Sequence, residues 1–157
     1  MIEVKVQSQT TVACPEEGQN MSFKWYGKKV KKQNREAGNK ALWKYAEAVL
    51  TQANTKVPHD EGTLERSGIV SQAKLPNAQS IFSQADSGTP NAKFNFAKGE
   101  MRFYISYNTP YAITLHESPV GEFNFRDKGE NKWLEKAAKE MSNKMESMTA
   151  KEMKKWL

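Results

Sequence analysis

The chain has 157 residues, enough for a single domain with its own core. Its one cysteine, Cys14, excludes an internal disulfide, and no apolar run is long enough to span a bilayer. Residues 1–6 lack the apolar region of a signal peptide. We therefore expect a soluble protein made in a cytoplasm. The mean hydropathy of −0.80 predicts extended polar segments or a surface buried only on assembly.

The net charge of +6 is concentrated in one segment. Residues 28–56 contain eight basic and two acidic residues, which accounts for the whole excess. A one-sided charge on a predicted helix suggests an acidic neighbour, either nucleic acid or an acidic protein. A solvated helix face explains the pattern equally well, because lysine is common on helix surfaces. The candidate residues facing DNA or an acidic partner are Lys28, Lys29, Lys31, Lys32 and Arg35.

The first half of the chain predicts a short strand, a loop and a long helix. Alternating apolar residues favour a strand at 2–6, and Pro15 and Gly18 favour a loop over 10–19. From Ser22 or Lys28 to Thr55, apolar residues recur at spacings of three, four or seven, as in an amphipathic helix. Pro58 ends this helix near Lys56, and Gly38 and Asn39 predict a kink or two shorter helices.

After a turn at Gly62, residues 64–74 are predicted to form a strand. Residues 76–100 are rich in proline, glycine, asparagine and serine, which predicts a flexible loop of functional importance. The apolar residues within it form either a second hairpin or a contact with a neighbouring subunit. The candidate interface residues are Phe82, Phe94 and Phe96, together with Trp156 near the C-terminus.

The second half predicts a strand and two helices. Residues 101–107 alternate as a half-buried strand, and Thr109 and Pro110 suit the first positions of a short helix that ends before Pro119. Residues 130–157 predict one long helix whose methionines form a core stripe or a binding face. The fold expected is α+β: a long N-terminal helix and a C-terminal helix packed on a small, mainly antiparallel β-sheet.

Two stretches, residues 57–68 and 107–117, are predicted to form the chain reversals between these elements. Gly62 supplies the backbone freedom that a tight turn needs, and Asp60 or Thr63 can satisfy its backbone donors. Tyr111 and Trp133 are large apolar anchors that, with Leu115, could clamp the last helix onto the sheet.

Catalytic chemistry has little support in these patterns. The two histidines stand in His59-Asp60-Glu61 and His116-Glu117, where carboxylates could complete a metal site, but neither spacing is a recognised one. Turn chemistry already explains Asp60, and His116 is expected to pack on Tyr111 or pair with a carboxylate. We therefore expect neither an enzyme nor a cofactor, with a metal-dependent hydrolase as the open alternative.

The segment from Trp25 to Lys32 interleaves aromatic and basic residues, which suits single-stranded nucleic acid. It matches no nucleic-acid-binding motif, so any contact with DNA is expected to involve phosphates without regard to sequence. A helix start that packs through Trp25 and is otherwise solvated is the alternative.

Three blocks, taken together and in order, give the chain a resemblance to a family. It resembles the tailed-bacteriophage morphogenesis proteins called minor capsid, neck (head–tail connector) or tail-completion proteins. The blocks are residues 57–67, the strand into 107–117, and 132–137 at the start of the last helix. The matching positions are Pro58, Asp60, Gly62, Leu64, Ser67, Pro110, Tyr111, Ala112, His116, Glu117, Trp133 and Leu134.

The resemblance implies one domain, residues 1–157, that acts as a structural virion protein at the head–tail junction and assembles in the bacterial host cytoplasm. Its partners would be copies of itself in a ring, connector and portal-side adaptor proteins, tail-tube or terminator proteins, and possible non-specific contacts with packaged DNA. Tail-terminator and minor capsid roles remain open within this class. A sequence-independent DNA-binding module is the alternative of another class.

Overall fold

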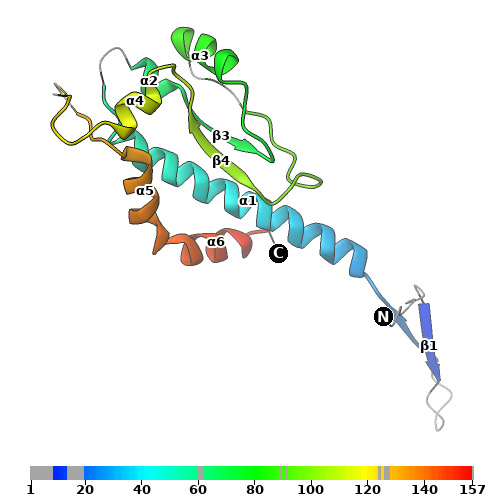
Figure 1. Cartoon of the computed structure of the whole chain (residues 1–157). Coiled ribbons are helices and arrows are strands. Elements are labelled where there is room, and N and C mark those ends of the chain that lie inside the picture. The colour runs from blue at the N-terminus through cyan, green and yellow to red at the C-terminus, as the bar shows by residue number, and fades with distance from the viewer. Residues whose placement is uncertain are drawn as a thin grey trace, which may run out of the picture. The chain divides into compact units, whose positions relative to one another are not determined.

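The structure, a computed structural model, describes residues 9–13, 20–59, 62–88, 90, 92–123, 125 and 128–156. The chain forms two compact units, Met1–Lys32 and Gln33–Leu157. In chain order the elements are β1 (Gln9–Ala13), β2 (Asn20–Lys24), α1 (Gly27–Asn54), α2 (Thr63–Arg66), β3 (Gly68–Gln72), α3 (Ala78–Ser87), β4 (Phe103–Tyr107), α4 (Ala112–Glu117), α5 (Trp133–Ser142) and α6 (Met145–Met153) (Figure 1).

The first unit contains an antiparallel hairpin and the first turns of α1. β1 and β2 pair with Gln9 opposite Lys24 and Ala13 opposite Asn20. The loop predicted from residue 10 is therefore wrong in its first part, because the run Thr10-Thr11-Val12 favours extended backbone through its β-branched side chains. The strand predicted at 2–6 and Cys14 lie outside the described residues.

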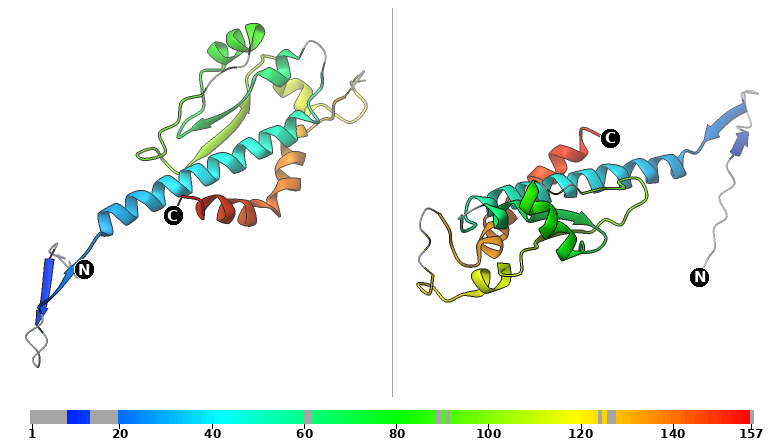
Figure 2. Two further views of the ribbon diagram at one scale, coloured as in Figure 1. Left: turned by 180° about the vertical axis from the view of Figure 1, so that it is seen from behind. Right: turned by 90° about the horizontal axis from the view of Figure 1, so that it is seen from above.

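The second unit places α1 between a two-stranded sheet and the C-terminal helices (Figures 1 and 2). Ala46 and Leu50 of α1 pack with Val70 of β3, whereas Ala53 packs with Ala137 of α5. β3 and β4 run antiparallel, with Gly68 opposite Tyr107. The predicted α+β class is confirmed: a long helix and C-terminal helices pack on a small antiparallel sheet.

The long helix is confirmed with the start predicted near Lys28, and the alternative start at Ser22 is wrong because that residue lies in β2. It is one helix, so the alternative of two shorter helices is also wrong. Gly38 and Asn39 serve packing instead. A Cβ at Gly38 would lie 2.6 Å from Cε of Met101, and the Asn39 amide donates to the carbonyls of Phe96 (2.8 Å) and Gly99 (3.2 Å). The Asn39 amide nitrogen thus has two acceptors, whereas its Oδ1 is buried with no hydrogen-bond donor among the described residues.

Two helices lie in segments where the sequence predicted a strand and a loop. The strand expected from residue 64 begins as α2, and β3 starts at Gly68. The segment 76–100, expected to be a loop or hairpin, contains α3. The Asn77 side chain accepts the backbone N–H of Ser80 at 3.1 Å, an N-cap that stabilises a helix start.

The remaining differences concern helix ends. β4 confirms the predicted strand, but α4 begins at Ala112, so Thr109 and Pro110 precede the helix. The C-terminal segment forms two helices because the chain turns at Asn143 and Lys144. The Ser142 hydroxyl donates to the Lys139 carbonyl, which competes with continuation of α5.

The methionine stripe is correspondingly split. Met141 is buried, whereas Met145 is exposed.

Leu157 lies outside the described residues. Within the described ranges, no helix combines the length and apolar character that crossing a membrane requires.

Candidate functional site

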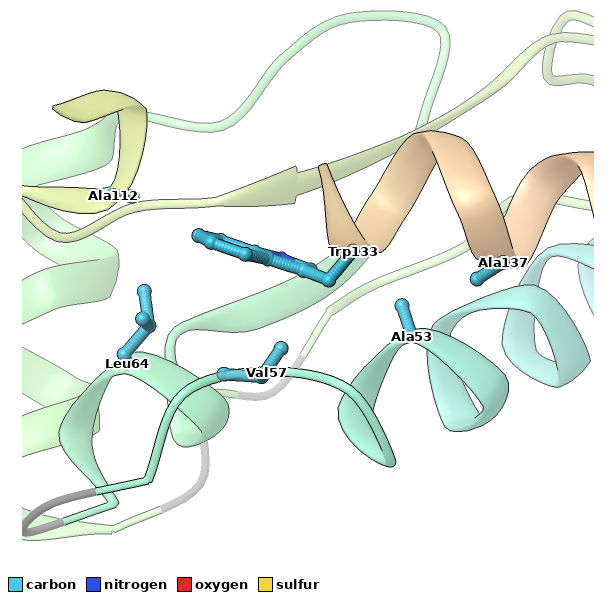
Figure 3. Packing of buried hydrophobic residues seen from close by; sticks show 6 residues of the cluster. All are labelled: Ala53, Val57, Leu64, Ala112, Trp133 and Ala137. Atoms are coloured by element: carbon cyan, nitrogen blue, oxygen red, sulfur yellow. The ribbon is translucent and has the colours of Figure 1, made fainter. Parts of the chain in front are cut away.

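The three sequence blocks meet in one apolar cluster. Its buried members, which we call the junction core, are Ala53, Val57, Leu64, Ala112, Trp133 and Ala137 (Figure 3). Every block contributes: the first supplies Val57 and Leu64, the second Ala112, and the third Trp133 and Ala137. Trp133 is 1% exposed, and Leu115 and Leu134 pack against the cluster. Leu64, Ala112 and Trp133, one motif position from each block, are therefore part of the core that joins α1, α2, α4 and α5.

A buried polar pair connects the first two blocks. The backbone N–H of Asn108 donates to the Ser67 hydroxyl oxygen at 3.2 Å, and its side-chain amide donates to the Ser67 carbonyl at 3.0 Å. The Ser67 hydroxyl in turn donates to the Leu64 carbonyl at 2.7 Å. The pair fixes the start of β3 against the end of β4, which sets the direction in which α4 leaves the sheet.

Main-chain hydrogen bonds join the third block, or the loop just before it, to the second block and to residues in or next to the first. The Glu130 N–H donates to the Lys56 carbonyl at 2.8 Å, and the Lys132 N–H donates to the His116 carbonyl at 2.8 Å. The His59 N–H donates to the Lys128 carbonyl at 3.2 Å. Because these bonds involve backbone groups, substitution of side chains does not remove them directly.

The turn after α1 uses glycine as predicted. Gly62 has φ +79°, and a Cβ there would lie 2.9 Å from Nη1 of Arg66. Thr63 does not cap α2, because its hydroxyl oxygen accepts from the Arg66 guanidinium at 3.3 Å. Pro58 is buried, and Asp60 lies outside the described residues.

The two histidines pair with different carboxylates. His59 Nδ1 lies 3.3 Å from Oε2 of Glu65, and His116 Nδ1 lies 2.6 Å from Oε1 of Glu117. The carboxylate pairing expected for His116 is confirmed. Its ring packs edge-on against Trp133, with 4.7 Å between centroids, whereas Tyr111 is exposed and the anchoring role predicted for it is wrong. Among the described residues, no three His, Cys, Asp or Glu side chains gather in the manner of a metal site.

A polar hollow of about 420 Å³ lies beside the first block. Glu47, Asn54, His59, Glu65 and Arg66 line it. Partial burial alone would raise the pKa of Glu65, but its interactions with Lys128 (2.9 Å) and His59 (3.3 Å) together outweigh burial and lower that pKa. The Arg66 Nε donates to the Ala85 carbonyl at 2.8 Å. The charged side chains of the hollow therefore hold neighbouring elements together.

The predicted interface aromatics differ in their surroundings. Phe94 and Phe96 each lie 5.5 Å from the ring of Trp43, so they pack within the protein. Phe82, on α3, is half-buried. Trp156 is exposed, and Nζ of Lys40 lies 3.6 Å from the centre of its ring.

Exposed apolar residues that the sequence did not identify lie on α4 and in the loop after it. Ile113 is 72% exposed and Val120 is 90% exposed. Val120 and the stacked pair Phe123 and Phe125 line a second hollow, of about 330 Å³. Pro119 and Gly121 mark this stretch as a loop in the sequence, but nothing local indicates that its apolar side chains remain in solvent.

The predicted basic residues Lys28, Lys29, Lys31, Lys32 and Arg35 are all exposed on α1. None of them forms an ion pair within the described part of the chain, in contrast to Lys56, which pairs with Glu140 at 3.0 Å. Pro110 and Glu117 of the second block are also exposed.

Comparison with models of protein families, with curated proteins and with solved structures finds no match. The resemblance to phage neck and tail-completion proteins therefore depends on the three sequence blocks.

Proposed function

We propose that this protein is a structural virion protein of a tailed bacteriophage, a subunit of the head–tail connector ring that joins the DNA-filled head to the tail. The observation that carries the proposal is the exposed apolar surface on α4 and the loop after it. Ile113 and Val120 are largely in solvent, and Val120 lines one hollow with Phe123 and Phe125. Soluble proteins rarely expose a contiguous apolar patch unless a partner covers it.

The junction core supports this proposal because it explains what the motif positions do. Leu64, Ala112 and Trp133 pack together at the base of α4, so they fix the direction of the helix that bears Ile113. A contact surface on a rigid support loses little conformational entropy when a partner binds. The same sequence blocks would thus serve assembly in each subunit of a ring.

A ring requires a head-to-tail contact, in which one surface of a subunit meets a different surface of its neighbour. The residues of α4 and the following loop supply one of these surfaces. Trp156, exposed on the segment after α6, is a candidate for a second contact, with a neighbouring subunit or with another connector or tail protein. The protein would be located in the virion at the head–tail junction.

Electron microscopy of particles from a phage with a stop codon in this gene tests the function. The expected result is DNA-filled heads beside separate, complete tails. Joined particles with tails of uncontrolled length would instead assign a tail-terminator role. Intact infectious virions would overturn a structural role at the junction.

A further inference from the structure

The strongest charge asymmetry of the molecule lies at the start of α1. Residues 24–32, which we call the basic segment, contain five lysines and no acidic residue. Arg35 is the next basic residue of the helix. With these six residues set aside, the remaining 18 basic residues balance the 18 acidic ones. The net positive charge of the protein thus equals the charge of the basic residues between Lys24 and Arg35.

The lysines of the basic segment are exposed, and the described part of the chain offers them no ion-pair partner. Lys24, Lys28, Lys29, Lys31 and Lys32 are all exposed. No ion pair involves any of them within the described residues, whereas Lys40, further along the same helix, pairs with Glu36 at 3.0 Å. Their charge is therefore available to an external anion.

This arrangement opposes the stability of the helix that carries it. The N-terminus of a helix has a partial positive charge, so lysines in its first turns are unfavourable there, and the first turn of α1 has no acidic residue. Lys28 also has like-charged neighbours three and four positions later, at Lys31 and Lys32, which repel it. A bound polyanion would offset both the unfavourable interaction with the helix N-terminus and the repulsion between the lysines. A helix face that only contacts water gains nothing from this clustering of charge.

Two aromatic residues adjoin the lysines. Trp25 and Tyr26 are 61% and 55% exposed, immediately before α1 begins. The Trp25 ring lies against Gly27, where a Cβ would be 2.3 Å from its Nε1. Lysines that contact phosphates, combined with aromatic rings on which bases stack, are the chemistry of sequence-independent binding to single strands.

We propose that the basic segment binds the phosphate backbone of nucleic acid without sequence preference, with Trp25 stacking on unpaired bases. Lysine ammonium groups act as point charges and lack the paired donors with which arginine recognises a particular base. This inference does not depend on the connector function, because it uses a different part of the chain.

Fluorescence anisotropy of the full chain with labelled mixed-sequence oligonucleotides tests the inference. The first variant combines Lys28→Gln, Lys29→Gln, Lys31→Gln and Lys32→Gln, which keeps helix propensity nearly constant. It should bind single strands at least tenfold more weakly at about 50 mM salt, and the slope of log K against log salt should fall by up to about 3. Trp25→Ala should weaken binding to single strands more than binding to duplex.

The matched control combines Lys139→Gln, Lys144→Gln, Lys151→Gln and Lys154→Gln, four exposed positions on α5, on α6 and at their ends. It removes the same charge and should keep the affinity and salt slope of the unmodified protein. Equal losses in both variants, or no binding by the unmodified protein at low salt, would overturn the inference. Displacement of the oligonucleotide by polyglutamate of equal charge would also overturn it, in favour of an acidic protein partner.

Discussion

Asn108 and Ser67, 41 positions apart in the chain, form a buried pair in which Asn108 donates two hydrogen bonds to Ser67, at 3.2 and 3.0 Å. The pair closes the end of the sheet from which α4 departs. Loss of either side chain leaves a buried polar group without its partner, and such a group costs more than a hydrogen bond contributes on average.

Asn108→Ala should therefore lower the free energy of unfolding by about 1–3 kcal/mol. Urea denaturation followed by circular dichroism measures the change. Asn34→Ala, at an exposed position of α1, is the control and should have little effect. Equal stability of the two variants would show that the pair does not hold the sheet end.

Trp133→Ala should be far more destabilising, because its ring fills the centre of the junction core (Figure 3). Removal of a buried aromatic side chain costs about 3–5 kcal/mol through lost burial and the cavity left behind. Trp156→Ala removes the same side chain from an exposed position and should cost about 0.5–1 kcal/mol, the contribution of its contact with Lys40. Similar unfolding midpoints in urea would contradict the central position of Trp133.

Gly62→Ala should lower the free energy of unfolding, whereas Gly88→Ala should leave it unchanged or raise it. Gly62 has φ +79°, where a side chain costs about 1–2 kcal/mol, and Arg66 and His59 crowd the added Cβ. Gly88 has extended backbone and open space around it, so alanine there should be neutral or stabilise by about 0.4–1 kcal/mol. Differential scanning calorimetry compares them, and a stable Gly62→Ala protein would refute the tight turn.

Stability should fall in acid partly through Glu65. Its pKa is lowered in the folded protein because Lys128 and His59 together outweigh the effect of burial, so its contribution is present above the ordinary carboxyl value of 4.5. That contribution is lost as the pH falls through the lowered folded pKa. Glu65→Gln should lower stability at pH 7 by about 0.5–1 kcal/mol and flatten the decline below about pH 4.5.

Thermal unfolding of both proteins between pH 7 and pH 3 measures this difference. Glu122→Gln changes an exposed glutamate that forms no ion pair among the described residues, and it should follow the unmodified curve. A Glu65→Gln curve parallel to that of the unmodified protein would exclude the contribution of this ion pair.

Charged substitutions on the proposed assembly surface should leave the isolated protein folded but prevent the joining of heads to tails. Ile113→Asp with Val120→Asp places two charges on exposed positions, so the unfolding temperature should change little. In a complementation assay, the double variant should fail to join heads to tails. Thr114→Asp, an exposed neighbour on α4, is the matched control. Normal virion yield from the double variant would remove this surface from the interface.

Patterns over a few residues were sufficient to predict the elements in which apolar residues recur at a regular spacing. The spacing of apolar residues predicted α1, alternation predicted β4, and Pro58 and Gly62 located the turn between α1 and α2. α3 was missed because its cap, Asn77, lies in a segment whose composition is typical of loops. The break between α5 and α6 was missed because the apolar spacing continues across it.

The sequence by itself determined the α+β class, the long helix and the three blocks that converge at the junction core, because periodicity and turn chemistry act over a few residues. Only the tertiary structure decided which anchors are buried: Trp133 lies in the core, and Tyr111 lies in solvent. It also decided that Asn108 meets Ser67 and that Val120 remains exposed. The physical reason is that burial depends on which surfaces distant segments bring together, and residue type and spacing do not specify that geometry.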